Sequence, residues 1–198
     1  MNISVERVEE IFADRSRYNT GSWVRHSENT ALAATTIAAA VKMDDELAYC
    51  MGLLHDIGRS FTQGQFLHIA RGYDFMKGEG AGDIARICLT HSFPLQILES
   101  YVGKIDIDEV QCEKYRELLM EMQYDGYDRL IQLCDAVSTE DGFVIPEKKF
   151  VRSVFKYGFN EYTIPKWEKT LSIKHDFDNM LGVDVIACLH ARYPALII

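Results

Sequence analysis

The residues with the clearest chemical potential are His55-Asp56, which follow an apolar run and precede Ile57-Gly58. An imidazole and a carboxylate at the end of a buried helix are costly to desolvate unless a partner stabilises them. A divalent cation is such a partner, because imidazole nitrogen and carboxylate oxygen both ligate metals. Gly58 is predicted to end the helix in a left-handed turn, which would present the pair at the edge of a cavity.

Four of the six histidines fall at predicted helix ends. His26 and His68 are expected to open helices, whereas His55 and His91 are expected to end them. Asp135 lies in an apolar helical turn. One histidine at a helix end is most simply a cap or a satisfied core group. Several histidines and carboxylates at the ends of apolar segments converge if they share a partner, and this pattern favours a metal site.

Hydrophobic periodicity predicts an all-α protein that positions these residues. Helices are expected over residues 4–14, 26–41, 46–57, 66–76, 83–90, 112–139 (interrupted at Asp125-Gly126), 147–157 and 165–181. No segment has a convincing strand pattern. The chain of 198 residues is long enough to bury one substantial core. We therefore expect a single helical-bundle domain over 1–198, with a metal-binding core at about 20–140 and C-terminal helices over 145–198 packing on it.

The composition of the chain limits the kinds of molecule that it is expected to bind. The net charge of −9 argues against binding to nucleic acid or an anionic membrane, which requires a basic surface. A small phosphorylated ligand stays compatible, because a metal and a few cations can reverse the field inside a pocket. The five cysteines are scattered without CxxC spacing, which is typical of reduced thiols in a cytoplasmic protein. The sequence has no signal-peptide pattern and no run of 18 apolar residues.

The order of these residues resembles the HD-domain superfamily of metal-dependent phosphohydrolases over about residues 20–140. The similar segments are Arg25-His26-Ser27, Leu53-Leu54-His55-Asp56-Ile57-Gly58 and Leu133-Cys134-Asp135-Ala136. A lone His-Asp dipeptide would be weak evidence, but the same dipeptide in an apolar helix with correctly ordered outer ligands is specific. The resemblance implies that a first metal would be held by His26, His55, Asp56 and Asp135.

The dinuclear branch of that superfamily has further histidines between the His-Asp pair and the last Asp. His68 and His91 are similar to them, although some members have two adjacent histidines where this chain has His91-Ser92. The resemblance implies one or two divalent ions per chain, with Asp56 bridging if there are two. The alternative is that His68 and His91 only hydrogen-bond around a single metal. Iron or manganese is favoured, and magnesium, zinc, nickel and cobalt stay open.

The expected function is hydrolysis of a phosphoester or phosphoanhydride of a nucleotide or dinucleotide. A divalent ion lowers the pKa of bound water from ~16 towards ~7, and Asp56 would hold and orient the resulting hydroxide. Arg59 is the best candidate for offsetting phosphoryl charge, ahead of Arg25 and Arg71. Among known relatives, the small dinuclear hydrolases of diadenosine polyphosphates are nearest in layout, although no segment is diagnostic for that substrate.

Two other functions compete with this expectation. One is a mononuclear phosphatase of nucleoside monophosphates, and the other is a non-catalytic ligand-sensing module. Residues 141–144 and 147–149 are expected to form a turn and a helix start, in preference to a segment that closes over the substrate with Phe143 stacked on a base. The apolar tail, residues 195–198, is expected to pack on the body of the protein or on a second subunit in a homodimer.

Overall fold

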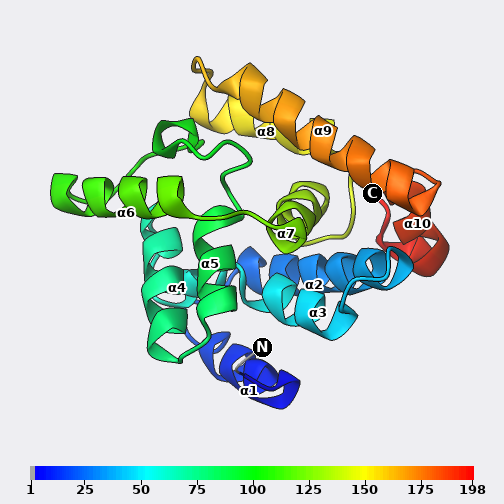
Figure 1. Ribbon diagram of the computed structural model, residues 1–198, viewed down its shortest axis with the longest axis horizontal. Coiled ribbons are helices and arrows are strands. Elements are labelled where there is room, and N and C mark those ends of the chain that lie inside the picture. Colours follow the sequence, from blue (N-terminus) through cyan, green and yellow to red (C-terminus); the bar gives the residue numbers. More distant parts are fainter. Residues whose placement is uncertain (1–2) are drawn as a thin grey trace.

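The computed structural model describes residues 3–198, which form a bundle of helices joined by short loops (Figure 1). The α-helices are α1 (Val5–Arg15), α2 (Ser22–Ala40), α3 (Asp45–Leu54), α4 (Leu67–Gly78), α5 (Gly82–Thr90), α6 (Glu109–Glu121), α7 (Gly126–Val137), α8 (Pro146–Tyr157), α9 (Thr163–Leu181) and α10 (Val185–Arg192). Short 3₁₀ turns are η1 (Ile57–Ser60), η2 (Leu98–Ser100) and η3 (Pro194–Leu196). Within residues 3–198 the only β-structure is two isolated bridges, so the predicted all-α class is confirmed.

Local sequence signals set several helix ends. The Asp44 carboxylate accepts from the Leu47 backbone N–H at 2.9 Å and so caps α3. Helix α7 begins with a capping box, in which Asp125 and Asp128 accept from each other's backbone N–H groups. Helix α9 ends at Gly182, whose φ of 69° is the left-handed conformation that glycine adopts without strain.

Small side chains let the helices around the predicted site pack closely. Helices α2 and α3 form the most extensively packed pair, with Ala31, Ala34 and Ala48 fully buried. A Cβ at Gly52 would lie 2.7 Å from the Ala31 Cα, so the two backbones meet where α3 crosses α2. Because α3 delivers His55, this contact fixes the distance between His55 and the helix that carries His26.

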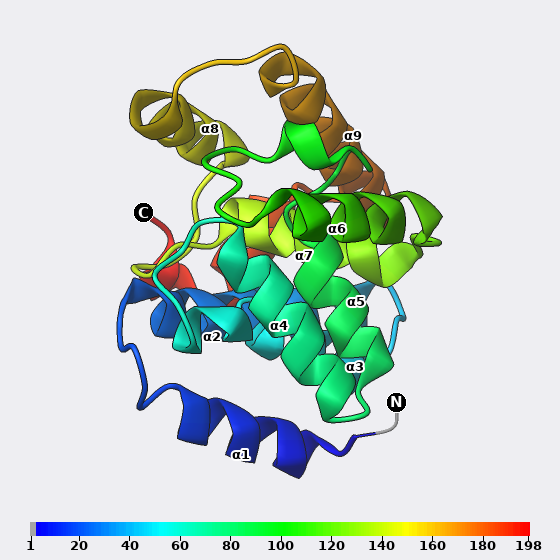
Figure 2. The ribbon, with the colours of Figure 1, turned by 90° about the vertical axis from the view of Figure 1, so that its left-hand side faces the viewer.

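The helices are arranged in layers around α7 (Figures 1 and 2). Helix α1 lies at one end of the molecule, and the α8–α9 pair lies at the opposite end. Helices α4 and α5 form an antiparallel hairpin beside α3, and α7 packs against both α2 and α9. The ends of α3 and α5 therefore lie near α7 and the C-terminal helices, whereas the turn between α4 and α5 lies at the α1 end, where Glu79 pairs with Arg7.

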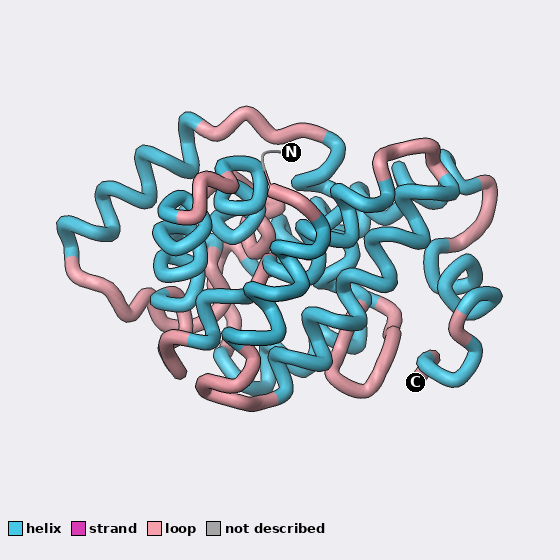
Figure 3. Tube along the Cα trace, turned by 90° about the horizontal axis from the view of Figure 1, so that it is seen from below, coloured by secondary structure: helices cyan, strands magenta, loops and turns pink. Residues whose placement is uncertain are grey.

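The C-terminal tail, residues 195–198, packs on the body of the chain. This was one of the two expectations, the other being contact with a second subunit. The Phe143 N–H donates to Leu196 O, and the Ile198 N–H donates to Phe143 O at 3.0 Å. Phe143 is fully buried, so it belongs to the core and does not face a ligand. Helix α10 and the 3₁₀ turn η3 lead into this tail near the C-terminus (Figure 3), and the sequence analysis did not predict α10.

None of the helices described over residues 3–198 is both long enough and apolar enough to cross a membrane.

Candidate metal centre

His26 lies in the second turn of α2, which begins at Ser22. The prediction that His26 opens the helix was therefore wrong, because the polar residues before it already form the first turn. His26 Nε2 lies 3.1 Å from an oxygen of Asp135 on α7 and 3.2 Å from His55 Nε2 at the end of α3. Three residues from three helices thus converge, and their ligand atoms lie within 4.8 Å of one another.

Gly58 has a different role from the one predicted. Helix α3 ends at Leu54, and Gly58 lies inside the 3₁₀ turn η1 without the positive φ of a left-handed turn. A Cβ at Gly58 would lie 1.8 Å from His68 O and 2.6 Å from Gly72 N. Glycine is needed here because the η1 backbone meets the α4 backbone at a distance that admits no side chain.

This close approach brings His68 of α4 against Asp56. His68 Nε2 lies 2.9 Å from Asp56 Oδ1, and His91 Nε2, at the end of α5, lies 3.6 Å from the same oxygen. Asp56, His68 and His91 are all buried, and their ligand atoms also lie within 4.8 Å of one another. The six predicted ligands therefore form two adjacent sets of three.

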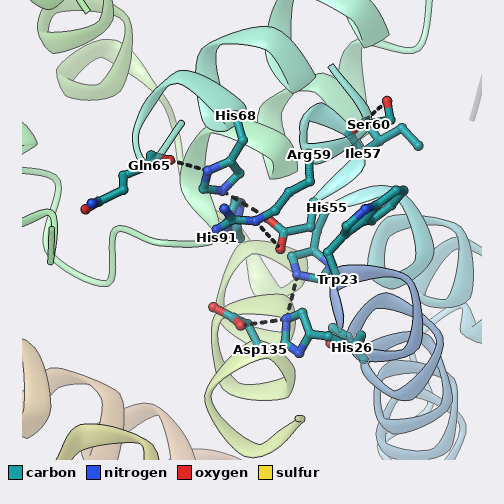
Figure 4. Close-up of polar contacts among 12 residues, drawn as sticks. Trp23, His26, His55, Ile57, Arg59, Ser60, Gln65, His68, His91 and Asp135 are labelled. Atoms are coloured by element: carbon teal, nitrogen blue, oxygen red, sulfur yellow. Dashed lines mark hydrogen bonds and ion pairs between the residues drawn. The ribbon is translucent and has the colours of Figure 1, made fainter. Parts of the chain in front are cut away.

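Figure 4 shows how the two sets adjoin. His26 and Asp135 lie on one side of His55, and His68 and His91 lie on the other. The ring centroids of His26 and His91 are 5.1 and 5.0 Å from that of His55. The two sets are close enough to form one continuous centre, with Asp56 following His55 directly in the chain.

Backbone carbonyls orient three of the four histidine rings. His55 Nδ1 lies 2.7 Å from Gly52 O, His91 Nδ1 lies 3.0 Å from Cys88 O, and His68 Nδ1 contacts Gln65 O. A carbonyl oxygen only accepts, so each Nδ1 carries the proton and each Nε2 offers a lone pair to the centre. Histidines that bind metals are typically held in this way through the nitrogen that is not a ligand.

Asp56 Oδ1 and His68 Nε2 provide a direct test of whether a cation fits. Both atoms are buried, and neither has a hydrogen-bond partner within residues 3–198. They lie 2.9 Å apart, but Nδ1 of His68 already carries the ring proton, so two lone pairs face each other. Such an arrangement is costly in a buried site unless a positive charge lies beside both atoms. The donor set therefore fits a divalent metal ion.

Two of the histidines, His55 and His91, are in the protonation state that ligation requires. Burial lowers the pKa of His55 and lowers that of His91 to about 3, so both rings are neutral at pH 7. Neutral imidazole is the form that binds a metal.

The carboxylates are charged although they are buried. Burial alone would raise the pKa of Asp56, but the Arg59 guanidinium beside it holds that pKa well below its usual range. Lys149 and His26 likewise outweigh the effect of burial on the pKa of Asp135. Both groups are ionised at neutral pH and available as anionic ligands.

Arg59, the predicted phosphate-binding cation, lies beside Asp56. Its Nε donates to Asp56 Oδ2 at 3.1 Å, on the oxygen that does not face His68. Arg25 and Arg71, the next candidates from the sequence, are exposed and are not among the residues lining the cavity described below. Of the three arginines, only Arg59 is placed to act at the centre.

A cavity of about 690 Å³ adjoins the two sets of ligands and is lined by His26, Asp56, His91 and Asp135. Its wall also carries cations from α8 and α9, and of these the sequence analysis considered only Lys149, as part of a less favoured segment closing over the substrate. They are Lys149, Arg152, Lys156 and Lys166. The available signal was the spacing of residues 149, 152 and 156, which places them on one face of a helix. That spacing alone is equally typical of a solvated face.

A helical bundle that gathers four histidines and two aspartates at the edge of a cavity defines a candidate metal-binding protein of the all-α class. The family model of the HD domain matches residues 23–140, which is more than half of the sequence. The chain belongs to the HD-domain family. Members of this family are mostly metal-dependent hydrolases, and the family lies within the metal-dependent phosphohydrolase superfamily. Comparisons with curated proteins and with solved structures found no match.

Proposed function

We propose that the protein is a metal-dependent phosphohydrolase that cleaves a phosphoester or phosphoanhydride of a nucleotide or dinucleotide. The observation that carries the proposal is the orientation of His55, His68 and His91. Each Nδ1 is held by a backbone carbonyl. The Nε2 atoms of His68 and His91 face Asp56, and that of His55 lies in the group with His26 and Asp135. Membership of the HD-domain family supports the same reaction class.

The residues that would hold metal are the two sets already described: His26, His55 and Asp135, and Asp56, His68 and His91. Two sets would suit two ions, and Asp56, which directly follows His55 in the chain, would be the candidate for a ligand common to both. Mixed imidazole and carboxylate ligands suit iron or manganese, whereas affinity alone does not select among first-row metals. A divalent ion bound here would lower the pKa of water and place positive charge beside the phosphoryl oxygens.

The chain's own groups would supply orientation and charge. Asp56 is ionised at neutral pH and held by Arg59, so it can orient an attacking water. Arg59 is charged and lines the cavity, where it would offset negative charge on the phosphoryl oxygens. The neutral rings of His55 and His91 would keep their Nε2 lone pairs available to bind the metal.

The test measures metal content and hydrolysis together. Protein reconstituted with manganese or iron is assayed against nucleoside mono-, di- and triphosphates and dinucleoside polyphosphates. Asp56→Asn is expected to lower hydrolysis by at least about 100-fold and to reduce metal content. Asp176→Asn is the matched control, because His175-Asp176 repeats the dipeptide on the exposed surface of α9. Equal activity in the two variants would contradict the proposal.

Two alternatives give different results in the same assay. A mononuclear phosphatase would hydrolyse nucleoside monophosphates with one metal per chain. A ligand-sensing module would hold its full metal content and turn over no substrate. The wide cavity and the number of cations on its wall favour the nucleotide or dinucleotide substrate over the monophosphate.

The proposed partner is a small phosphorylated molecule, with no role for nucleic acid or a membrane. The net charge of −9 supports this, because nucleic acid and anionic membranes require a basic surface, whereas a small ligand needs only the few cations that line the cavity. A cytoplasmic location and a homodimeric state belong to the same proposal.

A further inference from the structure

Helix α8 carries a row of cations along the cavity. Lys149, Arg152 and Lys156 all line it, and their spacing of three and four residues places them on one face of the helix. Lys148 on the same helix is exposed and is not among the lining residues. From Lys149 to Lys156 the helix rises about 10 Å, so the row extends well beyond the metal ligands.

The first cation of the row is anchored at the candidate metal centre. Lys149 Nζ donates to Asp135 Oδ1 at 3.2 Å and to Ser138 O at 3.0 Å. The positive charge of Lys149 is therefore partly neutralised by the Asp135 carboxylate. Arg152 and Lys156, further along α8, form no ion pair with any carboxylate within residues 3–198. Their charges are available to a ligand in the cavity.

Lys166 brings a third available charge from α9. Its Nζ donates to Ser92 O at 2.7 Å and to Ser100 O at 3.3 Å, and the described chain offers it no carboxylate partner. The ammonium also lies 6.0 Å from the centre of the Phe93 ring. Because carbonyl oxygens and an aromatic face carry no full negative charge, the ammonium is incompletely compensated and an anion beside it is favourable. Lys166 thus lines the same cavity as the α8 row with its positive charge largely unneutralised.

The charge balance of the cavity wall is opposite to that of the whole chain. The chain has a net charge of −9, whereas the wall has five basic residues and three acidic ones. Two of the three acids, Asp56 and Asp135, belong to the candidate metal centre, which leaves only Glu140. Any bound metal would add further positive charge. One phosphate group at the centre would leave the far end of the wall unneutralised.

We propose that Arg152, Lys156 and Lys166 bind additional phosphate groups of the substrate, so that the site selects a chain of two or more linked phosphates. This inference rests on the proposed phosphohydrolase function and names its substrate class. The scissile phosphate lies at the metal centre, and the remaining phosphates extend along α8. The residues responsible lie outside residues 23–140, the part that matches the family model.

The test is equilibrium binding of inorganic phosphates to the full-length protein by calorimetry. Orthophosphate, pyrophosphate and tripolyphosphate are titrated into metal-loaded protein and, because polyphosphates chelate metals, into chelator-treated protein as well. Adenosine triphosphate is a further arm, which separates a nucleotide source of linked phosphates from an inorganic one. The variant is Arg152→Ala/Lys156→Ala, whose two side chains lie on the exposed part of α8 and contribute little to folding.

A charge-matched control is available. Lys77→Ala/Lys148→Ala also removes two positive charges, and both of these lysines are exposed and outside the cavity lining. This control separates loss of a local contact from a change in net charge. A melting curve of each variant verifies that the fold is retained.

We expect the wild-type protein to bind tripolyphosphate at least tenfold more tightly than orthophosphate. Arg152→Ala/Lys156→Ala should weaken tripolyphosphate binding by about tenfold, equivalent to about 1.4 kcal/mol, and leave orthophosphate binding unchanged. Equal affinity for the two phosphates, or equal losses in the variant and its charge-matched control, would overturn the inference.

Failure of this inference is distinguishable from failure of the proposed function. If the protein hydrolyses phosphate compounds but the α8 variant binds tripolyphosphate normally, the proposal that α8 and α9 select linked phosphates is wrong and the proposed hydrolase function stands. If the affinity differences are found without any hydrolysis, the phosphate-binding assignment stands and the catalytic proposal fails.

Discussion

The metal-ligand cluster and helix α8 face the same cavity but are built in opposite ways. The ligands His55, His68 and His91 are almost completely buried, and backbone carbonyls hold their rings. On α8 only Pro146 is buried, and the cations Arg152 and Lys156 are exposed. One side of the cavity is therefore rigidly positioned, and the other side is adaptable.

This difference separates two tasks. Metal ligands must be held within a few tenths of an ångström, which requires dense packing around them. Cations that bind phosphate oxygens act over longer distances and tolerate solvent. The matched family segment, residues 23–140, contains the rigid part, and the adaptable part follows it in the chain. Reaction class is thus expected to depend on the first region, and substrate selection on the second.

The largest effect is expected from Gly58→Ala in the rigid region. Its new Cβ would lie 1.8 Å from His68 O, so η1 and α4 must separate. We expect the free energy of unfolding to fall by about 3–5 kcal/mol, together with loss of metal. Chemical denaturation and metal analysis measure both. Gly78→Ala is the control, because a Cβ there meets nothing within 4 Å and should change stability by at most ~1 kcal/mol. Similar losses in both variants would contradict the assigned role of Gly58.

Removing one ligand tests whether the rigid region holds two metals. His68→Ala deletes a member of the Asp56 set and leaves His26, His55 and Asp135 intact. A dinuclear centre predicts that bound metal falls from two ions to one per chain, measured by elemental analysis. His175→Ala, on the exposed surface of α9, is the control and should keep both ions. An unchanged stoichiometry of one ion per chain in all three proteins would establish the mononuclear alternative.

Sequence reasoning was most successful where the signal is local. The resemblance carried by the segments around His26, His55-Asp56 and Asp135 implied one set of four ligands. The structure groups His26, His55 and Asp135, and it places the adjacent Asp56 with His68 and His91 instead. The all-α class followed from periodicity in the same segments. His68 and His91 were harder to assign, because their approach to Asp56 depends on how the α4–α5 hairpin packs.

Sequence reasoning failed where the result depends on contacts between distant segments. Gly58 was assigned to a helix end, although its neighbours are His68 and Gly72 on another helix. Arg152 and Lys156 of α8 were missed, and closure by the segment with Lys149 was not favoured, because a basic helical stripe is usually solvated. Only the packing of α8 on α7 and α9 turns this stripe toward the cavity. No local pattern specifies that packing.

A smaller effect is expected from Lys166, which lies at the border of the two regions. Burial lowers the pKa of Lys166 to about 8, whereas the unfolded chain has a lysine pKa of about 10.4. Between these values the unfolded chain binds more protons, so this group makes stability rise with pH. The free energy of unfolding is measured at several pH values for the wild type and for Lys166→Met. The difference between the two proteins isolates the part due to Lys166, which should increase between pH 8 and 10. Lys169→Met on the same helix retains Lys166 and should keep the wild-type slope.

The smallest effect is expected on the outer face of α8, where Phe155 is 88% exposed. Because Phe155 contributes almost no buried area, Phe155→Ser should change the free energy of unfolding by no more than about 0.5 kcal/mol. Phe143→Ala is its counterpart in the core and should cost about 3–5 kcal/mol, because that side chain is fully buried against the tail. Denaturant titration of both variants measures the contrast directly. A loss above about 1.5 kcal/mol for Phe155→Ser would mean that α8 is packed as firmly as the metal-ligand region, and the division between a rigid and an adaptable wall would then be wrong.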